Sequence, residues 1–153
     1  MRIKIYIYVG STFSLLFGQL TFTVNEISLN ADASKDVYAV DMDKDGDIDV
    51  LSASDYDDKI AWYENNGKQS FFTHNIDTNA DGANAVYALD LDNDGDIDVL
   101  SASDNHDRIA WYENDGNQTF TLHNIDTNAD GAYDVYAVDL DNDGDIDVLS
   151  ASD

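Results

Sequence analysis

The chain repeats itself with a period of 49 residues. The string DKDGDIDVLSAS at 43–54 returns as DNDGDIDVLSAS at 92–103 and again at 141–152. Residues 36–69 match residues 85–118 at 25 of 34 positions without a gap. One unit of this size cannot bury its apolar face alone, so repeated units stack on their neighbours. The fold is therefore expected to be an array of similar modules rather than one irregular domain.

The repeats set the domain boundaries. Thr21-Phe22-Thr23 lies two periods before Thr119-Phe120-Thr121, so the array begins near residue 21. We predict repeat 1 at 21–69, repeat 2 at 70–118 and a truncated repeat 3 at 119–153. The third unit lacks a counterpart of 109–113, and the chain therefore holds fewer than three complete units.

Each unit is expected to contain four short strands. The second unit predicts them at 86–89, 97–101, 108–113 and 120–125, the last counted from the next period. These segments are rich in Val, Ile, Tyr, Trp and Thr, which favour strands. Asn66-Gly67 and Asp115-Gly116 favour a type I′ hairpin turn between the third and fourth strands. Four antiparallel strands in about 50 residues match a β-propeller blade, so the predicted fold class is all-β with partial propeller-type blades.

The N-terminal segment is interpreted as a signal peptide. Arg2 and Lys4 precede a mostly apolar run, 5–17, with a plausible cleavage site after Gly18. This run is too short to span a bilayer as a helix. The alternative is that its first part, IKIYIYV, is a buried strand of the fold. We predict removal of residues 1–18 and a secreted or cell-surface location.

Charge and cysteine content exclude several classes of protein. The chain has 32 Asp and Glu against 7 Lys and Arg, a formal net charge of −25. Such a surface repels nucleic acids and anionic membranes, so neither is expected as a partner. The aromatic content of 11% argues against disorder. No cysteine is present, so disulfides cannot stabilise an exported fold.

The repeated acidic loop predicts a calcium site. Numbered from Asp41, Asp90 or Asp139, each loop has carboxylates at positions 1, 3, 5, 7 and 9 and glycine at position 6. Ca²⁺ takes six to eight oxygen ligands, and glycine permits the sharp turn around one ion. The loop is not an EF-hand, because position 12 is serine and both flanks are strands. Mg²⁺ and Zn²⁺ fit less well, since no histidine lies in the loop and Mg²⁺ keeps more of its water.

The motif D-x-D-x-D-G-D-x-D between two strands resembles the FG-GAP (VCBS-type) repeat, the blade of integrin α-subunit propellers. The Phe-Gly and Gly-Ala-Pro signatures are absent, and Val-Leu-Ser-Ala-Ser stands where such a strand would continue. The resemblance implies one Ca²⁺ per loop, about three in all. It implicates as ligands Asp41, Asp43, Asp45, Asp47 and Asp49, then Asp90, Asp92, Asp94, Asp96 and Asp98, and finally Asp139, Asp141, Asp143, Asp145 and Asp147. By analogy with calcium loops of this kind, positions 1, 3 and 5 would bind through their side chains, position 7 through its backbone carbonyl, and position 9 through a further carboxylate.

No catalytic constellation stands out from the repeats. His74 and His123 share one register, as do Ser52, Ser101 and Ser150, whereas an active site usually breaks a repeat. Trp62 and Trp111 could stack on a sugar, but packing within or between blades is favoured. We predict that the chain is not an enzyme.

Function is expected to lie in extracellular binding. The two complete intervals differ mostly in one loop, 56–59 against 105–108, and such loops diversify binding surfaces, although drift in an unconstrained turn explains the same difference. We expect an adhesion or recognition scaffold for a protein or glycan. It would be a fragment of a longer propeller or a module that assembles with copies of itself. Alternatives are part of an extracellular polysaccharide-degrading enzyme or a calcium-rigidified spacer.

Overall fold

The structure is a computed structural model, and it describes residues 3–8 and 22–153. Every regular element in this part of the chain is a β-strand. The first six strands are β1 (Ile3–Tyr8), β2 (Phe22–Ser28), β3 (Ser34–Val40), β4 (Asp49–Ser54), β5 (Lys59–Asn65) and β6 (Phe71–Asp77). The next six are β7 (Ala83–Leu89), β8 (Asp98–Ser103), β9 (Arg108–Asn114), β10 (Phe120–Asp126), β11 (Asp134–Val138) and β12 (Asp147–Ala151).

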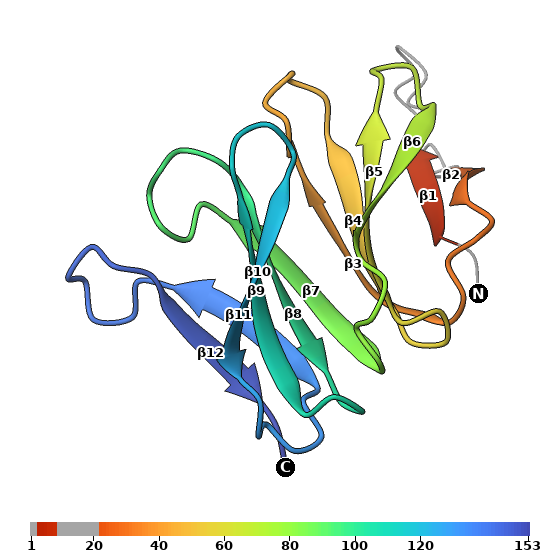
Figure 1. Cartoon of the computed structure of the whole chain (residues 1–153). Coiled ribbons are helices and arrows are strands. Elements are labelled where there is room, and N and C mark those ends of the chain that lie inside the picture. Colours follow the sequence, from red (N-terminus) through yellow and green to blue (C-terminus); the bar gives the residue numbers. More distant parts are fainter. Residues whose placement is uncertain (1–2, 9–21) are drawn as a thin grey trace, which may run out of the picture.

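The strands form two complete four-stranded blades flanked by two hairpins. The first blade has the order β3-β4-β5-β6, and the second has the order β7-β8-β9-β10. The N-terminal hairpin is β1-β2, and the C-terminal hairpin is β11-β12. All pairs are antiparallel. The sheets fan out side by side in chain order, and the first strand of the second blade, β7, contacts both β3 and β11 (Figure 1).

The predicted fold class is confirmed. Each of the four strands expected in the second unit is present. Three of them are longer than predicted by one to three residues at one end, and β8 begins one residue later and ends two residues later than predicted. The sheets are offset from the sequence period, because β6 begins at Phe71, inside the second predicted repeat, yet completes the first blade. A blade therefore combines the end of one period with the start of the next.

The predicted type I′ turns are wrong. The hairpin between β5 and β6 is a longer loop closed by a hydrogen bond from Asn66 N to Ser70 O of 3.1 Å. Gly67 and Gln69 adopt positive φ, at 71° and 61°, whereas a type I′ turn needs positive φ at two adjacent residues. Asn66 instead uses its side chain, which accepts hydrogen bonds from the amides of Lys68 and Ser70.

The core lies between neighbouring sheets. Leu51 and Trp62 of the first blade pack with Val86 and Val99 of the second in one buried cluster. A second cluster joins the second blade to the C-terminal hairpin and includes Leu100, Ile109 and Val135. Stacking against neighbours is what buries the apolar faces, as the repeat predicted.

Much of the predicted signal peptide lies outside the described residues. Within it, Ile3–Tyr8 forms β1, which pairs with β2. This is the strand that the sequence analysis gave as the alternative, and cleavage itself stays a prediction. No helix able to cross a membrane occurs in the described part of the chain.

Candidate metal centre

Each acidic loop joins the first strand of a sheet to the second. The three loops follow β3, β7 and β11 and project from the same end of the sheets (Figure 1). Each carries a glycine at position 6 with a φ of 96° to 99°, a backbone conformation that side chains disfavour. Position 4 also has positive φ and is Lys44, Asn93 or Asn142. These two residues bend the chain back around its own carboxylates.

The loop backbone is held by its own aspartates. In the first loop, Asp41 Oδ2 accepts a hydrogen bond from Gly46 N at 3.1 Å, and Asp43 Oδ1 accepts one from Asp45 N at 3.2 Å. The second and third loops repeat the contact to the glycine, also at 3.1 Å. In the first two loops the contact to the glycine leaves Oδ1 of Asp41 and of Asp90 without a protein donor. In the third loop Asp139 Oδ1 also accepts a hydrogen bond, from Asp143 N at 3.2 Å.

The carboxylates at the start of each loop converge. One oxygen from each member of a triad lies within 4.8 Å of the others. The triads are Asp41, Asp43 and Asp45 in the first loop, Asp90, Asp92 and Asp94 in the second, and Asp139, Asp141 and Asp147 in the third. Three negative oxygens at this separation repel one another, so each triad favours a bound cation.

Two oxygens at these sites are buried without a partner. Asp41 Oδ1 and Asp90 Oδ1 are shielded from water and accept no hydrogen bond from the protein. A buried carboxylate oxygen in this state is costly unless a proton or a metal ion satisfies it. These position 1 oxygens are therefore suited to a hard cation that takes oxygen ligands, as Ca²⁺ does.

Position 9 has a different role in the complete blades. Both oxygens of Asp49 accept backbone hydrogen bonds, from Met42 N at 3.1 Å and from Asn65 N at 2.7 Å. Asp98 repeats this with Leu91 N and Asn114 N. Each carboxylate thus ties the loop to the third strand, which supplies the asparagine amide. Asp49 and Asp98 are almost fully buried and lie outside the triads.

The third loop belongs to a hairpin that has no third strand among the described residues. Asp147 Oδ2 accepts a hydrogen bond from Leu140 N at 3.0 Å, the counterpart of the Met42 contact. The described part of the chain supplies no counterpart of Asn65 beside β12. Asp147 consequently joins the triad of its own loop, in place of Asp143 at position 5.

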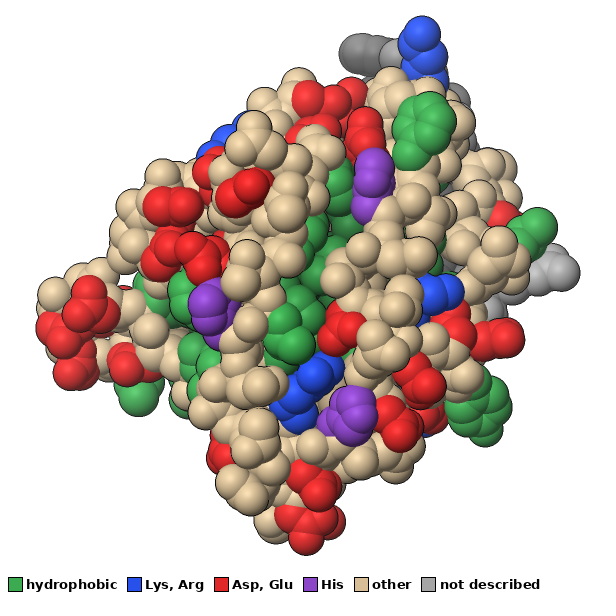
Figure 2. Space-filling model, in the orientation of Figure 1, with side chains coloured by type: hydrophobic (Ala, Val, Ile, Leu, Met, Phe, Trp, Pro, Cys, Tyr) green, Lys and Arg blue, Asp and Glu red, His purple; other side chains and the backbone are tan. Residues whose placement is uncertain are grey.

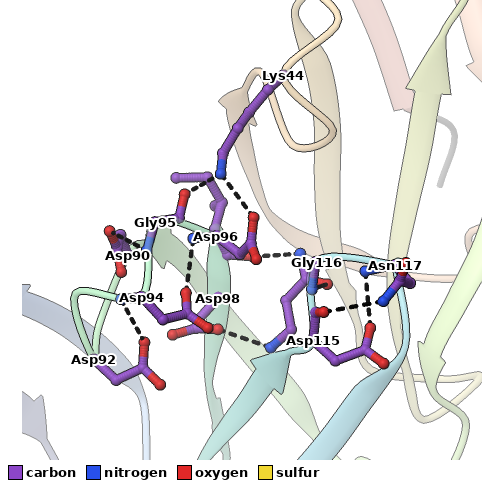
Figure 3. Close-up of polar contacts among 12 residues, drawn as sticks. Lys44, Asp90, Asp92, Asp94, Gly95, Asp96, Asp98, Asp115, Gly116 and Asn117 are labelled. Carbon is purple, nitrogen blue, oxygen red and sulfur yellow. Dashed lines mark hydrogen bonds and ion pairs between the residues drawn. The ribbon is translucent and has the colours of Figure 1, made fainter.

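The aspartate side chain at position 7 lies outside the triads. The side chain of Asp96 lies against Gly116, where a Cβ atom would collide with it, and Asp47 lies against Gly67 in the same way. Lys44 Nζ bridges the blades, because it donates to Gly95 O and pairs with Asp96 Oδ1 at 2.7 Å (Figure 3). Asp145, at position 7 of the third loop, is also outside the triad.

The electrostatics of the sites follow from burial. Burial raises the pKa of Asp49 and of Asp98, and the backbone amides that donate to these carboxylates oppose the rise. Burial also raises the pKa of Asp43, and the nearby charges of Asp45 and Asp49 add to this. Acidic side chains outnumber Lys and Arg over the face shown in Figure 2, which favours cations generally.

The sequence analysis missed two polar clusters. The repeated histidines stack on tryptophan, with ring centroids 4.4 Å apart for Trp62 and His74, and His74 Nε2 lies 2.7 Å from Glu64 Oε2. At the junction of the two blades, Asp77 accepts hydrogen bonds from Arg108 and Tyr112. The repeated positions of the Trp, His and Glu residues are visible in the sequence. The contact of Asp77 with Arg108 and Tyr112 crosses from one blade to the next, so it depends on how the sheets stack.

Comparison with models of known protein families matches the FG-GAP-like repeat twice, over residues 41–101 and 90–150. Together the two matches cover most of the chain and all three acidic loops. The same kind of comparison with curated proteins finds no match.

Proposed function

Because the chain belongs to the FG-GAP-like repeat family, we propose that it is a calcium-stabilised, non-enzymatic scaffold for extracellular recognition of a protein or glycan. The observation that carries the metal part is the convergence of three carboxylates in every loop. The partnerless buried oxygens of Asp41 and Asp90 support it further. Each ion would bridge carboxylates that otherwise repel, and would fix the loop that joins the first two strands of its sheet.

An extracellular location fits this chemistry. Calcium is plentiful outside cells, and a chain without cysteine needs another source of rigidity there. One bound ion stabilises a fold by roughly 2.7 kcal/mol when its free concentration is 100 times its dissociation constant. Three independent sites would contribute on the order of 8 kcal/mol, comparable to the net stability of a whole domain.

The recognition surface is proposed at the end of the sheets opposite the acidic loops. Here the repeats differ: Lys35, Asn84 and Tyr133 occupy one register position and line a single depression. Tyr56, with 81% of its surface exposed, stands beside Lys35 at a second depression, where Asn105 is its counterpart in the next repeat. Exposed tyrosines next to charged and amide side chains suit a polar ligand with an apolar face, such as a sugar.

The metal sites are tested by calorimetric titration of Ca²⁺ into the full chain freed of metal. Three ions per chain are expected, and Mg²⁺ should bind more weakly at each site because it requires tighter octahedral geometry. Asp90→Asn combined with Asp92→Asn should remove one ion. Asp115→Asn is the control. It removes one acidic charge, against two in the double variant, in an exposed turn where the first repeat already has Asn66. Absence of Ca²⁺ binding at millimolar concentration would overturn the proposal that the acidic loops bind calcium.

The recognition surface is tested on an array of immobilised glycans and, in parallel, with extracellular matrix proteins. Tyr56→Ala and Tyr133→Ala should each weaken binding about tenfold or more without changing the melting temperature. Phe72→Ala is the control, because Phe72 is also exposed but lies on β6, away from this surface. Equal loss of binding in all three variants would contradict the proposed surface.

A further inference from the structure

The first two acidic loops have nearly the same internal geometry. In each, the amide of the position 6 glycine donates to the position 1 aspartate at 3.1 Å. The amide of position 7 donates to the position 5 aspartate at 2.8 Å in both loops. The carboxylates at positions 1, 3 and 5 form the triad in both. A difference in metal affinity between these two sites would therefore come from their surroundings.

The surroundings differ in one charged contact. Lys44, at position 4 of the first loop, extends onto the second loop, where its ammonium donates to Gly95 O and pairs with Asp96 Oδ1 at 2.7 Å (Figure 3). Position 4 of the second loop is Asn93, which carries no charge. Among the described residues, no other ion pair involves an acidic loop. The second loop alone among these three is therefore paired with a lysine.

The charge of Lys44 also acts on the second triad. The hydrogen bond with Asp96 raises the pKa of Lys44, loss of hydration opposes the rise, and the charges of Asp96, Asp90 and Asp94 add to it. Asp90 and Asp94 belong to the second triad. The ammonium therefore interacts with the same carboxylates that would bind the ion.

The lysine is not needed to shape the second loop. Asp96 packs against Gly116, and Asp47 packs against Gly67 in the same way, although no ion pair holds Asp47 among the described residues. The first triad also forms without a lysine from another blade. Lys44 consequently adds positive charge to the second loop without giving it a different geometry.

A fixed positive charge has two opposite effects on an acidic loop. It reduces the repulsion among the carboxylates when no metal is bound, and it repels a divalent cation that enters the loop. Both effects favour the empty site over the occupied one, so the affinity for the cation falls. The size of the change is moderate, because the Lys44 side chain is 49% exposed and salt screens exposed charges.

We propose that Lys44 is an intramolecular counter-ion of the second acidic loop, which weakens calcium binding there and holds the loop to the first blade when the site is empty. This inference rests on the proposed function, because it requires that the acidic loops bind calcium. The second loop then fills after the first, whose geometry is otherwise the same. Calcium in the second loop should in turn weaken the contact of Lys44, because linked equilibria are reciprocal.

The effect on affinity is tested by calorimetric titration of Ca²⁺ into the full chain freed of metal. Lys44→Asn gives the first loop the residue that the other loops carry, Asn93 and Asn142, which have φ of 60° and 63°. The loop should therefore keep its shape. At low ionic strength the substitution should raise the affinity of one site about fivefold. Unchanged or lower affinities would overturn the role of Lys44.

Two further variants identify the affected site. In the background of Asp90→Asn with Asp92→Asn, which disables the second site, Lys44→Asn should change the remaining affinities by less than twofold. Lys68→Asn is the matched control, because it removes the same charge from an exposed turn where the second repeat has Asn117. A gain that persists in this background, or an equal gain in Lys68→Asn, would show an effect of net charge alone and would overturn the proposal.

The bridge between the blades is tested in the absence of metal. In EDTA at low salt, Lys44→Asn should melt about 2 °C below Lys68→Asn, because it loses the contact with Asp96. The difference should disappear when both variants also carry Asp96→Asn. Equal melting temperatures before that change would overturn the bridge.

The titration separates this inference from the proposed function. Absence of Ca²⁺ binding by the unchanged chain would overturn both the calcium function and the effect of Lys44 on affinity. Binding of Ca²⁺ by the unchanged chain, with no gain in Lys44→Asn, would overturn the role of Lys44 and leave the calcium function intact.

Discussion

Two segments of this protein have the same sequence and different surroundings. DVLSA at 98–102 forms most of β8, in which every residue is buried, whereas DVLSA at 147–151 forms β12, in which four of five residues are exposed. Leu100 is 0% exposed and Leu149 is 39% exposed. The difference arises from what covers the two strands. β9 lies beside β8 and the C-terminal hairpin packs against it, whereas β12 has neither kind of neighbour among the described residues. Burial in this fold is a property of the array rather than of the local sequence.

The comparison extends to the acidic loops. Asp98 is clamped between Leu91 N and Asn114 N, while Asp147 keeps only the first kind of contact and joins its metal triad. The third strand therefore decides whether position 9 is a structural anchor or a candidate ligand. Four experiments test this difference between the complete blades and the C-terminal hairpin.

The largest difference is expected from the leucines. Leu100→Ala should lower the free energy of unfolding by about 3 kcal/mol, because it leaves a cavity in a packed core. Leu149→Ala should lower it by less than about 1 kcal/mol, because the side chain is partly exposed. Urea denaturation of both variants in Ca²⁺ measures this. Equal losses would contradict the difference in burial between β8 and β12.

The anchoring aspartates should differ next. Asp98→Ala leaves two backbone amides without an acceptor and should cost about 2 kcal/mol of stability. Asp147→Ala removes one exposed acceptor and should cost about 0.5 kcal/mol. Thermal denaturation in EDTA isolates this effect from metal binding. A larger loss for Asp147→Ala would contradict the assignment of position 9 in the complete blades as the structural anchor.

Metal affinity should show the reverse order. Asp147→Asn should weaken one calcium site by roughly tenfold, about 1.4 kcal/mol, because its carboxylate belongs to the third triad. Asp98→Asn should leave all three affinities nearly unchanged. Calorimetric titration compares the two variants directly, and a weakened site in Asp98→Asn would show that position 9 is a ligand in every loop.

The smallest effect concerns pH in the absence of metal. Burial raises the pKa of Asp98 above its ordinary value of 3.8, so the folded state binds this proton more tightly than the unfolded state. Stability in EDTA should therefore rise as pH falls from 7 through the raised pKa toward 3.8. Asp98→Asn should reduce this rise, and Asp147→Asn should not. Stability that only decreases on acidification would contradict the effect of burial.

Much of this architecture could be predicted from the sequence, because the same strand and loop patterns recur in each repeat. The strands and the acidic loops follow from residue type, period and turn signals. The positions within the loop could not be assigned so easily. The sequence alone does not distinguish the five aspartates at alternate positions. In the structure Asp96 packs against Gly116, and Asp98 accepts a hydrogen bond from Asn114 N. Both partners come from the third strand and the turn that follows it, so their effect depends on tertiary pairing.

The same limit applies between sheets. Lys44 differs from Asn93 and Asn142 at one loop position, which marked it as distinct, yet its contact with Asp96 depends on the spacing of two blades. Tyr38, Tyr87 and Tyr136 occupy the same position in three repeats, and their rings lie against one another with centroids 4.8 and 4.7 Å apart. The sequence shows the shared position but not this contact between sheets. The repeat predicts the strands and loops within each module, whereas the contacts between modules depend on how the sheets stack.

Calcium bound in the aspartate loops is expected to stabilise this fold. Its most direct test is thermal denaturation of the full chain in millimolar Ca²⁺ and in EDTA, followed by circular dichroism. We expect a melting temperature higher by about 20 °C in Ca²⁺, from roughly 8 kcal/mol of binding energy. Identical melting curves of a folded protein in the two buffers would contradict it.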